Sequence, residues 1–217
     1  MDLTLVGLHP TQRTNGTGRG SRGVRGFSTT EMATTLLVTS LLSTLTAPSI
    51  EHYVSLAQQV RAVHDARTIA VSLWRMQDDV GWQARNPGGL ATFVLLVGDG
   101  APPEIAAGGD PRWLLPVTVP DVDRLANHLV RNGVGYRRIA PWPGGGWHGP
   151  YIDSGVTADP WGHRWAVNAK WLVSGSGVDV IVLSAGPNGV IETPFESNDM
   201  VAGGDDVLAL VSSGTQG

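Results

Sequence analysis

The longest uncharged stretch of the chain runs from Met32 to Ile50, and an amphipathic segment follows it as far as Val80. In the second segment, apolar residues recur at intervals of three, four or seven, which is the spacing of one face of an α-helix. The apolar positions are Leu56, Val60, Val63, Ala70, Leu73 and Val80, and the polar positions on other faces are Gln58, Arg61, Asp65, Arg67, Gln77 and Asp78. We therefore predict one near-continuous helix from Ser28 to about Val80. Pro48 should bend it, because an interior proline removes a hydrogen bond and clashes with the preceding turn.

The rest of the chain contains short elements separated by turn residues. Residues 81–89 break the helix, and the apolar run 91–97 is short enough to be a buried strand. Residues 121–132 have helical spacing and a glycine follows them, which favours the end of a helix. Residues 164–170 and 179–183 are predicted strands of an antiparallel sheet. This order predicts an α+β fold in which a long N-terminal helix packs on a C-terminal antiparallel β-sheet.

Composition limits the classes of protein to consider. At 217 residues with 41% hydrophobic content, the chain can form one folded domain, with or without an anchor. Its 29 glycines and 14 prolines indicate many turns and loops. The formal charge is −4, and residues 27–217 alone carry 11 basic and 18 acidic side chains, which argues against a nucleic-acid partner. Because there is no cysteine, disulfides and thiolate metal ligands are excluded.

A distinctive group of residues lies at the start of the uncharged run. Gly26 is followed by Phe27, and Glu31 lies four residues further along. The upstream arginines are Arg13, Arg19, Arg22 and Arg25. This arrangement resembles the cleavage and methylation site of type IV pilins and type II secretion pseudopilins. The resemblance implies that a prepilin peptidase cuts after Gly26 and that the new N-terminal Phe27 is methylated. Glu31 and Pro48 then fall where the family carries an acid and a proline.

The resemblance also implies a membrane and filament role for the first half of the helix. A bilayer core needs about 20 mainly apolar residues, a length that Phe27–Ala47 supplies. Its Ser and Thr hydroxyls can bond back to helix carbonyls. A carboxylate in this setting costs roughly 2.5–3.5 kcal/mol, so Glu31 needs a partner. In the pilin family that partner is the free amine of Phe27 on a neighbouring subunit, and the arginines hold the leader in the cytoplasm.

Two other interpretations explain the apolar run without a filament. One is an ordinary secretory signal peptide cleaved near Ala47, and the other is a plain membrane anchor. The acid at the head of the run and the proline after Ala47 argue against a signal peptide. The anchor accounts for the hydrophobicity but not for the spacing of Gly26, Glu31 and Pro48.

The C-terminal half carries a second resemblance, to the major pseudopilin of type II secretion. It rests on Trp147–Ile152, on Asp159-Pro160-Trp161-Gly162 and on Val178–Gly189. Asp-Pro-Trp-Gly is also a turn sequence in its own right, because the Asp side chain can bond the backbone. Residues 91–145 have no counterpart and are expected to be an insertion. The tryptophans expected to cover the sheet or meet the helix are Trp161, Trp165 and Trp171.

The same resemblance implies a structural calcium ion in the loop 184–207. Carried over by position, the ligands are the Ala185 carbonyl, the Asn188 side chain, and the carboxylates of Asp205 and Asp206. Calcium suits this set because it takes six to eight oxygen ligands. An ordinary tight turn at Asn188-Gly189 and a solvated turn at the two aspartates form the alternative.

This chain departs from the family pattern in two respects. Asn188 stands where the family usually has an aspartate, which removes one negative charge. The loop between Gly189 and Asp205 is long and carries Glu192, Glu196 and Asp199, any of which can substitute for the missing acid.

No catalytic signature is present. The six histidines are scattered, and there is no H-E-x-x-H, no G-x-S-x-G and no cysteine nucleophile. The sequence therefore predicts a structural protein rather than an enzyme.

We expect a subunit of a type II secretion pseudopilus, single-pass in the bacterial inner membrane with its globular domain in the periplasm. The expected partners are other copies of the chain, the prepilin peptidase, other pseudopilins and inner-membrane secretion components. The alternatives are a minor pseudopilin, a type IV pilin subunit, or an exported calcium-stabilised domain. The expected segments are a cleaved leader (1–26), a transmembrane and filament-core helix (27–50) and a periplasmic domain (51–217).

Overall fold

The computed structural model describes residues 26–81, 94–114, 123–139, 145–153, 155–173 and 175–214. The chain divides into two compact units, residues 1–48 and 49–217, and each is described by itself. The predicted leader and its arginines at positions 13, 19, 22 and 25 lie outside the described residues. The first residues of two predicted elements, 91–93 and 121–122, also lie outside them.

The predicted N-terminal helix is observed as α1, Thr29–Val80. A reciprocal pair of hydrogen bonds caps its start. The Glu31 backbone N–H donates to Ser28 Oγ at 3.2 Å, and the Ser28 N–H donates to Glu31 Oε2 at 2.9 Å. This is a capping box, which satisfies two N–H groups that otherwise lack helical partners. At the other end Gly81, with φ of 91°, donates to the Gln77 carbonyl and stops the helix.

Hydroxyl groups line the N-terminal part of α1 as expected, bonding back to carbonyls one turn earlier. The Oγ1 of Thr35 donates to the Glu31 carbonyl at 2.7 Å, and Ser43 Oγ donates to the Thr39 carbonyl at 2.9 Å. Similar bonds are made by Thr34, Thr39 and Thr44. Among the helices that the structure describes, none is both long and apolar enough to cross a membrane. The bend at Pro48 stays a prediction, because this residue lies at the boundary between the two units.

The face of α1 that packs on the domain agrees with the predicted face in part, since Ala70 and Leu73 are buried and Val63 and Val80 pack against the core. The buried residues are Ala62, Ala66, Ile69, Ala70, Leu73 and Met76. Leu56 and Val60, predicted to be inside, are 51% and 63% exposed. Gln77, predicted to lie on an outer face, is fully buried, and its amide makes no hydrogen bond with any described residue. Alanines every four residues allow the helix to approach its partners closely, so small side chains define the contact face.

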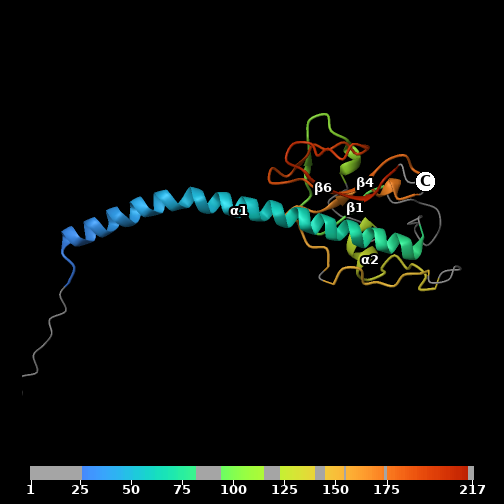
Figure 1. Ribbon diagram of the computed structural model, residues 1–217, viewed down its shortest axis with the longest axis horizontal. Helices are drawn as coiled ribbons and strands as arrows, with labels where there is room; N and C mark the ends of the chain where they lie inside the picture. Colours follow the sequence, from blue (N-terminus) through green and yellow to red (C-terminus); the bar gives the residue numbers. More distant parts are fainter. Residues whose placement is uncertain are drawn as a thin grey trace, which may run out of the picture. The chain divides into compact units, whose positions relative to one another are not determined.

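Four antiparallel strands form the sheet beside this helix (Figure 1). They are β1 (Leu96–Val97), β3 (Ala166–Val167), β4 (Val180–Ser184) and β6 (Val207–Ser212), in the order β1-β3-β4-β6. Ala166 pairs with Leu183, and Val182 pairs with Ala209. The α+β class, with a helix packed on an antiparallel sheet, is therefore confirmed.

Several elements differ from the predicted ones. The helix predicted at 121–132 is the shorter α2, Leu125–Leu129, and the strand predicted at 164–170 pairs only at β3 before the 3₁₀ turn Ala169–Trp171. The sequence did not predict β6. It also did not predict the parallel pair β2 (Glu104–Ile105) and β5 (Val190–Ile191), which joins part of the insertion to the candidate calcium loop. A further 3₁₀ turn covers Pro111–Trp113.

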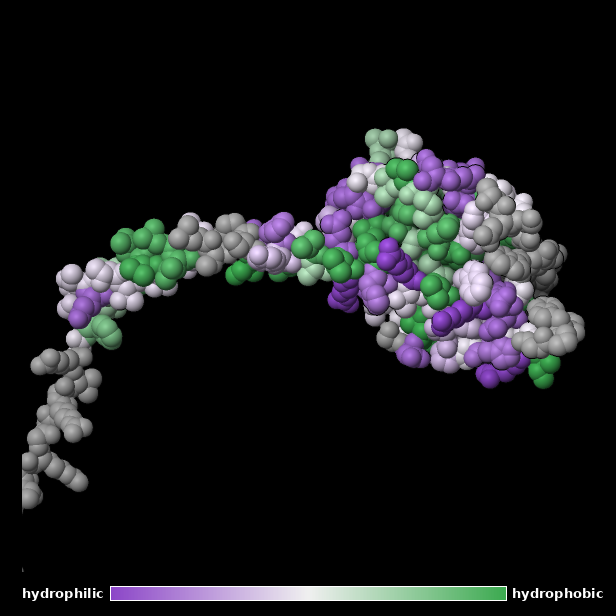
Figure 2. Space-filling model, in the orientation of Figure 1, coloured by the Kyte–Doolittle hydropathy of each residue, from purple (hydrophilic) through white to green (hydrophobic). Residues whose placement is uncertain are grey.

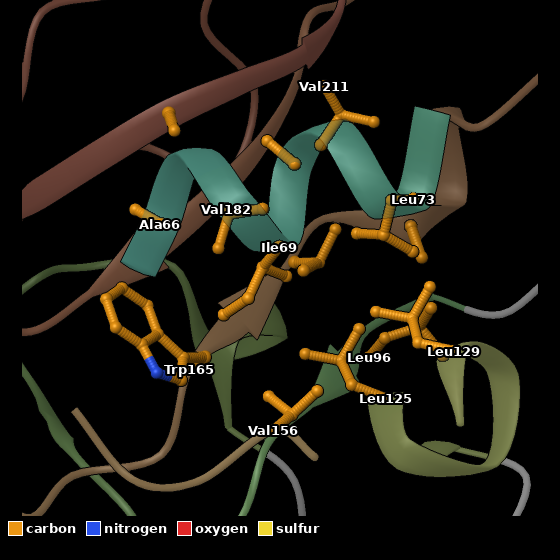
Figure 3. Packing of buried hydrophobic residues seen from close by; sticks show 14 of the residues in the cluster. Ala66, Ile69, Leu73, Leu96, Leu125, Leu129, Val156, Trp165, Val182 and Val211 are labelled. Atoms are coloured by element: carbon orange, nitrogen blue, oxygen red, sulfur yellow. The ribbon is translucent and has the colours of Figure 1, made fainter. Parts of the chain in front are cut away.

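The two faces of the sheet bury different sets of residues, as alternation along a strand requires. Val180 and Val182 of β4 face α1 and α2, whereas Ile181 and Leu183 pack against Trp113 and Phe195. Figure 3 shows Leu73 of α1 in the first cluster, with Leu96, Leu125, Leu129 and Trp165. The predicted role of the tryptophans is confirmed, since Trp165 is buried in this core and Trp161 and Trp171 pack against it.

Candidate metal centre

The predicted calcium loop begins with a tight turn at the end of β4. Gly186 and Gly189 both have positive φ, 63° and 72°, and the Gly189 N–H donates to the Gly186 carbonyl at 3.3 Å. Within this turn, Asn188 Oδ1 accepts a hydrogen bond from the Val190 N–H at 2.7 Å. The Asn188 side chain therefore stabilises the turn. Because an amide oxygen has two lone pairs, Oδ1 retains one that could bind a cation.

A second turn, which ends at Asp206, brings the first aspartate to this site. The Asp206 N–H donates to the Gly203 carbonyl at 3.0 Å, and Asp205 Oδ2 accepts from the Asn188 N–H at 3.2 Å. A Cβ added at Gly186 would lie 2.3 Å from the Asp205 carbonyl oxygen and 3.0 Å from its Oδ1. Only glycine at position 186 lets the two turns approach this closely. Of the four predicted ligands, Asn188 lies in the first turn, and Asp205 and Asp206 lie in the second turn.

Asp206 faces the segment after β5 and is 7% exposed. Its Oδ2 accepts three hydrogen bonds, from the Glu192 N–H (2.9 Å), the Thr193 N–H (2.7 Å) and Thr193 Oγ1 (2.6 Å). Burial raises the pKa of Asp206, and the negative charge of Glu192 raises it further, against the effect of these hydrogen bonds.

Two carboxylate oxygens of the loop have no hydrogen-bond donor among the described residues. Asp205 Oδ1 and Asp206 Oδ1 are buried and accept no hydrogen bond from any described residue. A buried carboxylate oxygen without a donor is unfavourable, and calcium is a hard cation that binds such oxygens. Within the described segments, no three acidic or histidine side chains form a metal-binding group, so the predicted set depends on two carboxylates and two neutral oxygens. If calcium binds this loop as predicted, Ala185, Asn188, Asp205 and Asp206 are the residues that would hold it.

A buried aspartate outside the loop holds the first turn in place. Asp159 Oδ1 accepts from the N–H groups of Trp161 (3.0 Å) and His163 (2.8 Å), as expected for the Asp-Pro-Trp-Gly turn. Its Oδ2 accepts from Ser184 Oγ at 2.5 Å, and Ser184 Oγ in turn accepts from the Gly186 N–H at 3.1 Å. The sequence predicted the local bonds but not the link to Ser184, which joins residues 25 positions apart.

The predicted processing residues lie in the other unit. Gly26, Phe27 and Glu31 are exposed, and the Phe27 side chain is 79% accessible. The two residues that flank the predicted cleavage position, Gly26 and Phe27, are therefore exposed just before α1 begins.

Together these features define an α+β protein with a long N-terminal helix and an antiparallel sheet. Comparison with models of known protein families, with curated proteins and with solved structures found no significant match to this chain.

Proposed function

We propose that this chain is a structural subunit of a type IV pilin-like filament, most similar to the major pseudopilin of a type II secretion system. It is made as a precursor, inserted in the bacterial inner membrane and cut after Gly26 by a prepilin peptidase. Copies then assemble through the N-terminal helix, with the periplasmic domain outside and secretion components as further partners. The subunit has no reaction of its own.

The exposed apolar surface of N-terminal α1 supports this proposal most strongly. Every described side chain from Phe27 to Thr44 is exposed, and Figure 2 shows apolar side chains along this segment. The large apolar members are Phe27, Met32, Leu36, Leu37, Val38, Leu41 and Leu42. A helix with apolar residues all round is buried in its working state, in lipid or against other helices. The intervening Ser and Thr residues suit close helix packing.

The charge of Glu31 separates two explanations for the apolar helix, which are burial in lipid alone and packing against other copies of the chain. In the structure its carboxylate caps the helix through Ser28, which a capping box achieves with either Glu or Gln. The charge itself is not needed for capping. After cleavage the Phe27 amine becomes a cation near the helix start, and a Phe27 amine on a neighbouring copy gives the charge of Glu31 a partner.

The variant Glu31→Gln tests this assignment, because it retains the capping hydrogen bonds and removes only the charge. We expect normal cleavage and an unchanged domain, but a loss of sheared, pelleted filament of more than about tenfold. The loss is expected because removing one member of a desolvated charge pair weakens association by about 2–5 kcal/mol. The matched control is Glu51→Gln, at an exposed position of the same helix, which should assemble normally. Filament yield equal to wild type in Glu31→Gln would contradict the proposal.

The loop geometry also supports a second candidate, an exported calcium-stabilised domain behind an ordinary signal peptide or anchor. This candidate uses the oxygens of Asp205 and Asp206 but gives no role to the charge of Glu31. It predicts normal export of Glu31→Gln and, for a signal peptide, a mature chain that begins near Ala47.

A further inference from the structure

Acidic and basic residues are separated along the second half of the chain. Residues 124–152 contain four arginines and no acidic residue, whereas residues 171–217 contain six acidic residues and no basic one. The whole chain has a formal charge of −4, so the arginine-rich segment is a local exception. A basic patch on an acidic protein attracts acidic surfaces, including those of other copies of the same chain.

Three of these arginines are exposed around a short loop that follows α2. The Asn132 side chain closes this loop, because it accepts from the Tyr136 N–H at 2.7 Å and donates to the Tyr136 carbonyl at 2.9 Å. Arg131 and Arg137 therefore flank the neck of the loop, and Arg138 comes next. All three are exposed, and none forms an ion pair with an acidic side chain of the described segments. We refer to residues 131–139 as the basic tip.

The exposed acids of the C-terminal part lie in the loop that follows β5. Glu192, Glu196 and Asp199 are exposed, and we refer to residues 192–201 as the acidic loop. Glu196 forms an ion pair with Arg112. Glu192 and Asp199 form no ion pair with a basic side chain in the described part of the chain. The acidic loop therefore has negative charge left for a basic partner.

The basic tip and the acidic loop belong to opposite faces of the sheet. Val134 of the basic tip packs in the core that α1 and α2 cover, whereas Phe195 of the acidic loop packs with Trp113 on the other face. Each also presents a large apolar side chain, since Ile139 is 84% exposed and Val201 is 62% exposed. These two are the most exposed large apolar side chains among the described residues after α1. An apolar side chain beside unpaired charges is typical of a protein–protein interface.

We propose that the basic tip of one copy docks on the acidic loop of a second copy, with Ile139 and Val201 inside the contact. Two different patches on opposite faces form a head-to-tail contact, which leaves one patch of each kind free at the ends of any pair. Such a contact adds further copies and builds open filaments or rings rather than closed dimers. The proposal deepens the filament role and rests on that proposed function, but it concerns the domain and not the N-terminal helix.

The test is cross-linking of the full chain in its membranes, which is specific because the native chain has no cysteine. With Arg137→Cys and Asp199→Cys in one chain, a short bismaleimide reagent should give a ladder of products from the dimer upwards, because each copy faces two different neighbours. Each single variant should remain monomeric, since like patches do not meet. The matched control combines Arg137→Cys with Asp153→Cys, at an exposed acid outside the acidic loop, and should also give no ladder.

Charge reversal separates an electrostatic contact from proximity alone. In the double-cysteine chain, Arg131→Glu or Glu192→Lys should each lower the yield of the ladder by at least about threefold, because like charges then face each other. The two reversals together should restore the yield. Salt at roughly 1 M, where the Debye length is about 3 Å, should lower it again.

Three results would overturn the proposal. They are the absence of a ladder, dimers in the single-cysteine variants, and a ladder that neither reversal changes. The N-terminal residue of the same protein is measured separately. A chain that begins at Phe27 but gives no ladder would keep the filament proposal and remove only this contact. A ladder from a chain that begins near Ala47 would keep the contact and remove the pilin-like pathway.

Discussion

Replacement of Leu73 by alanine is expected to lower the free energy of unfolding by about 2–5 kcal/mol. Leu73 is fully buried where α1 meets the core, in a cluster that also contains Leu129 and Val211. Truncation removes apolar contact and leaves a cavity that the sheet and α2 can fill only in part. The expected result is a clear fall in the denaturant midpoint with unchanged slope, measured by tryptophan fluorescence in urea.

Leu56→Ala is the matched control on the same helix. The hydrophobic spacing alone placed Leu56 on the same face as Leu73, but Leu56 is 51% exposed. Its truncation should therefore cost no more than about 0.5 kcal/mol, as for most surface substitutions. Equal costs at the two positions would show that the buried face of α1 has been assigned incorrectly.

The second large effect is expected for Asp159→Ala. This change removes the acceptor for Trp161 N–H, His163 N–H and Ser184 Oγ, all bound to one carboxylate that is 5% exposed. Each buried donor left without an acceptor costs about 1–3 kcal/mol, although water can recover part of this. We expect a total loss of about 3–5 kcal/mol, measured by urea unfolding. Asp159→Asn keeps one acceptor oxygen and should lose less.

Asp153→Ala is the control for this prediction, because Asp153 is exposed in a loop close in sequence. It should leave the unfolding midpoint unchanged. A small effect of Asp159→Ala, similar to that of Asp153→Ala, would show that the link through Ser184 to the Gly186 turn does not hold the loop.

The limits of α1 could be predicted because local residues determine them. Ser28 and Glu31 form the capping box and Gly81 takes a positive φ, and both signals lie at the ends of the periodic segment. The buried face was harder to predict. Large aliphatic residues dominate a periodicity argument, whereas the small alanines at positions 62, 66 and 70 are almost completely buried. Burial of Gln77 carries no sequence signal, since nothing in its spacing distinguishes it from a surface glutamine.

Some features of the sheet and of the loop could not be predicted from the sequence. The strands β1 and β3 each pair over two residues, too few for a period-two pattern. Residues 207–212 do alternate between buried and less buried positions, a pattern that could have revealed β6. From the sequence, Asp205 and Asp206 were predicted to be a pair of ligands to one ion. In the structure their carboxylates accept hydrogen bonds from different segments, at Asn188 and at Thr193. The position of Glu192 beside them depends on close packing over Gly204 and so required the structure.

The measurement that tests the central proposal most directly is mass spectrometry of the N-terminal peptide of the membrane-extracted protein. The account predicts a mature chain that begins at methylated Phe27, with residues 1–26 removed. A chain that begins near or after Ala47, or one that retains its leader, would contradict the pilin-like pathway. The candidate cation site of Asp205 and Asp206 would then belong to an exported domain rather than to a filament subunit.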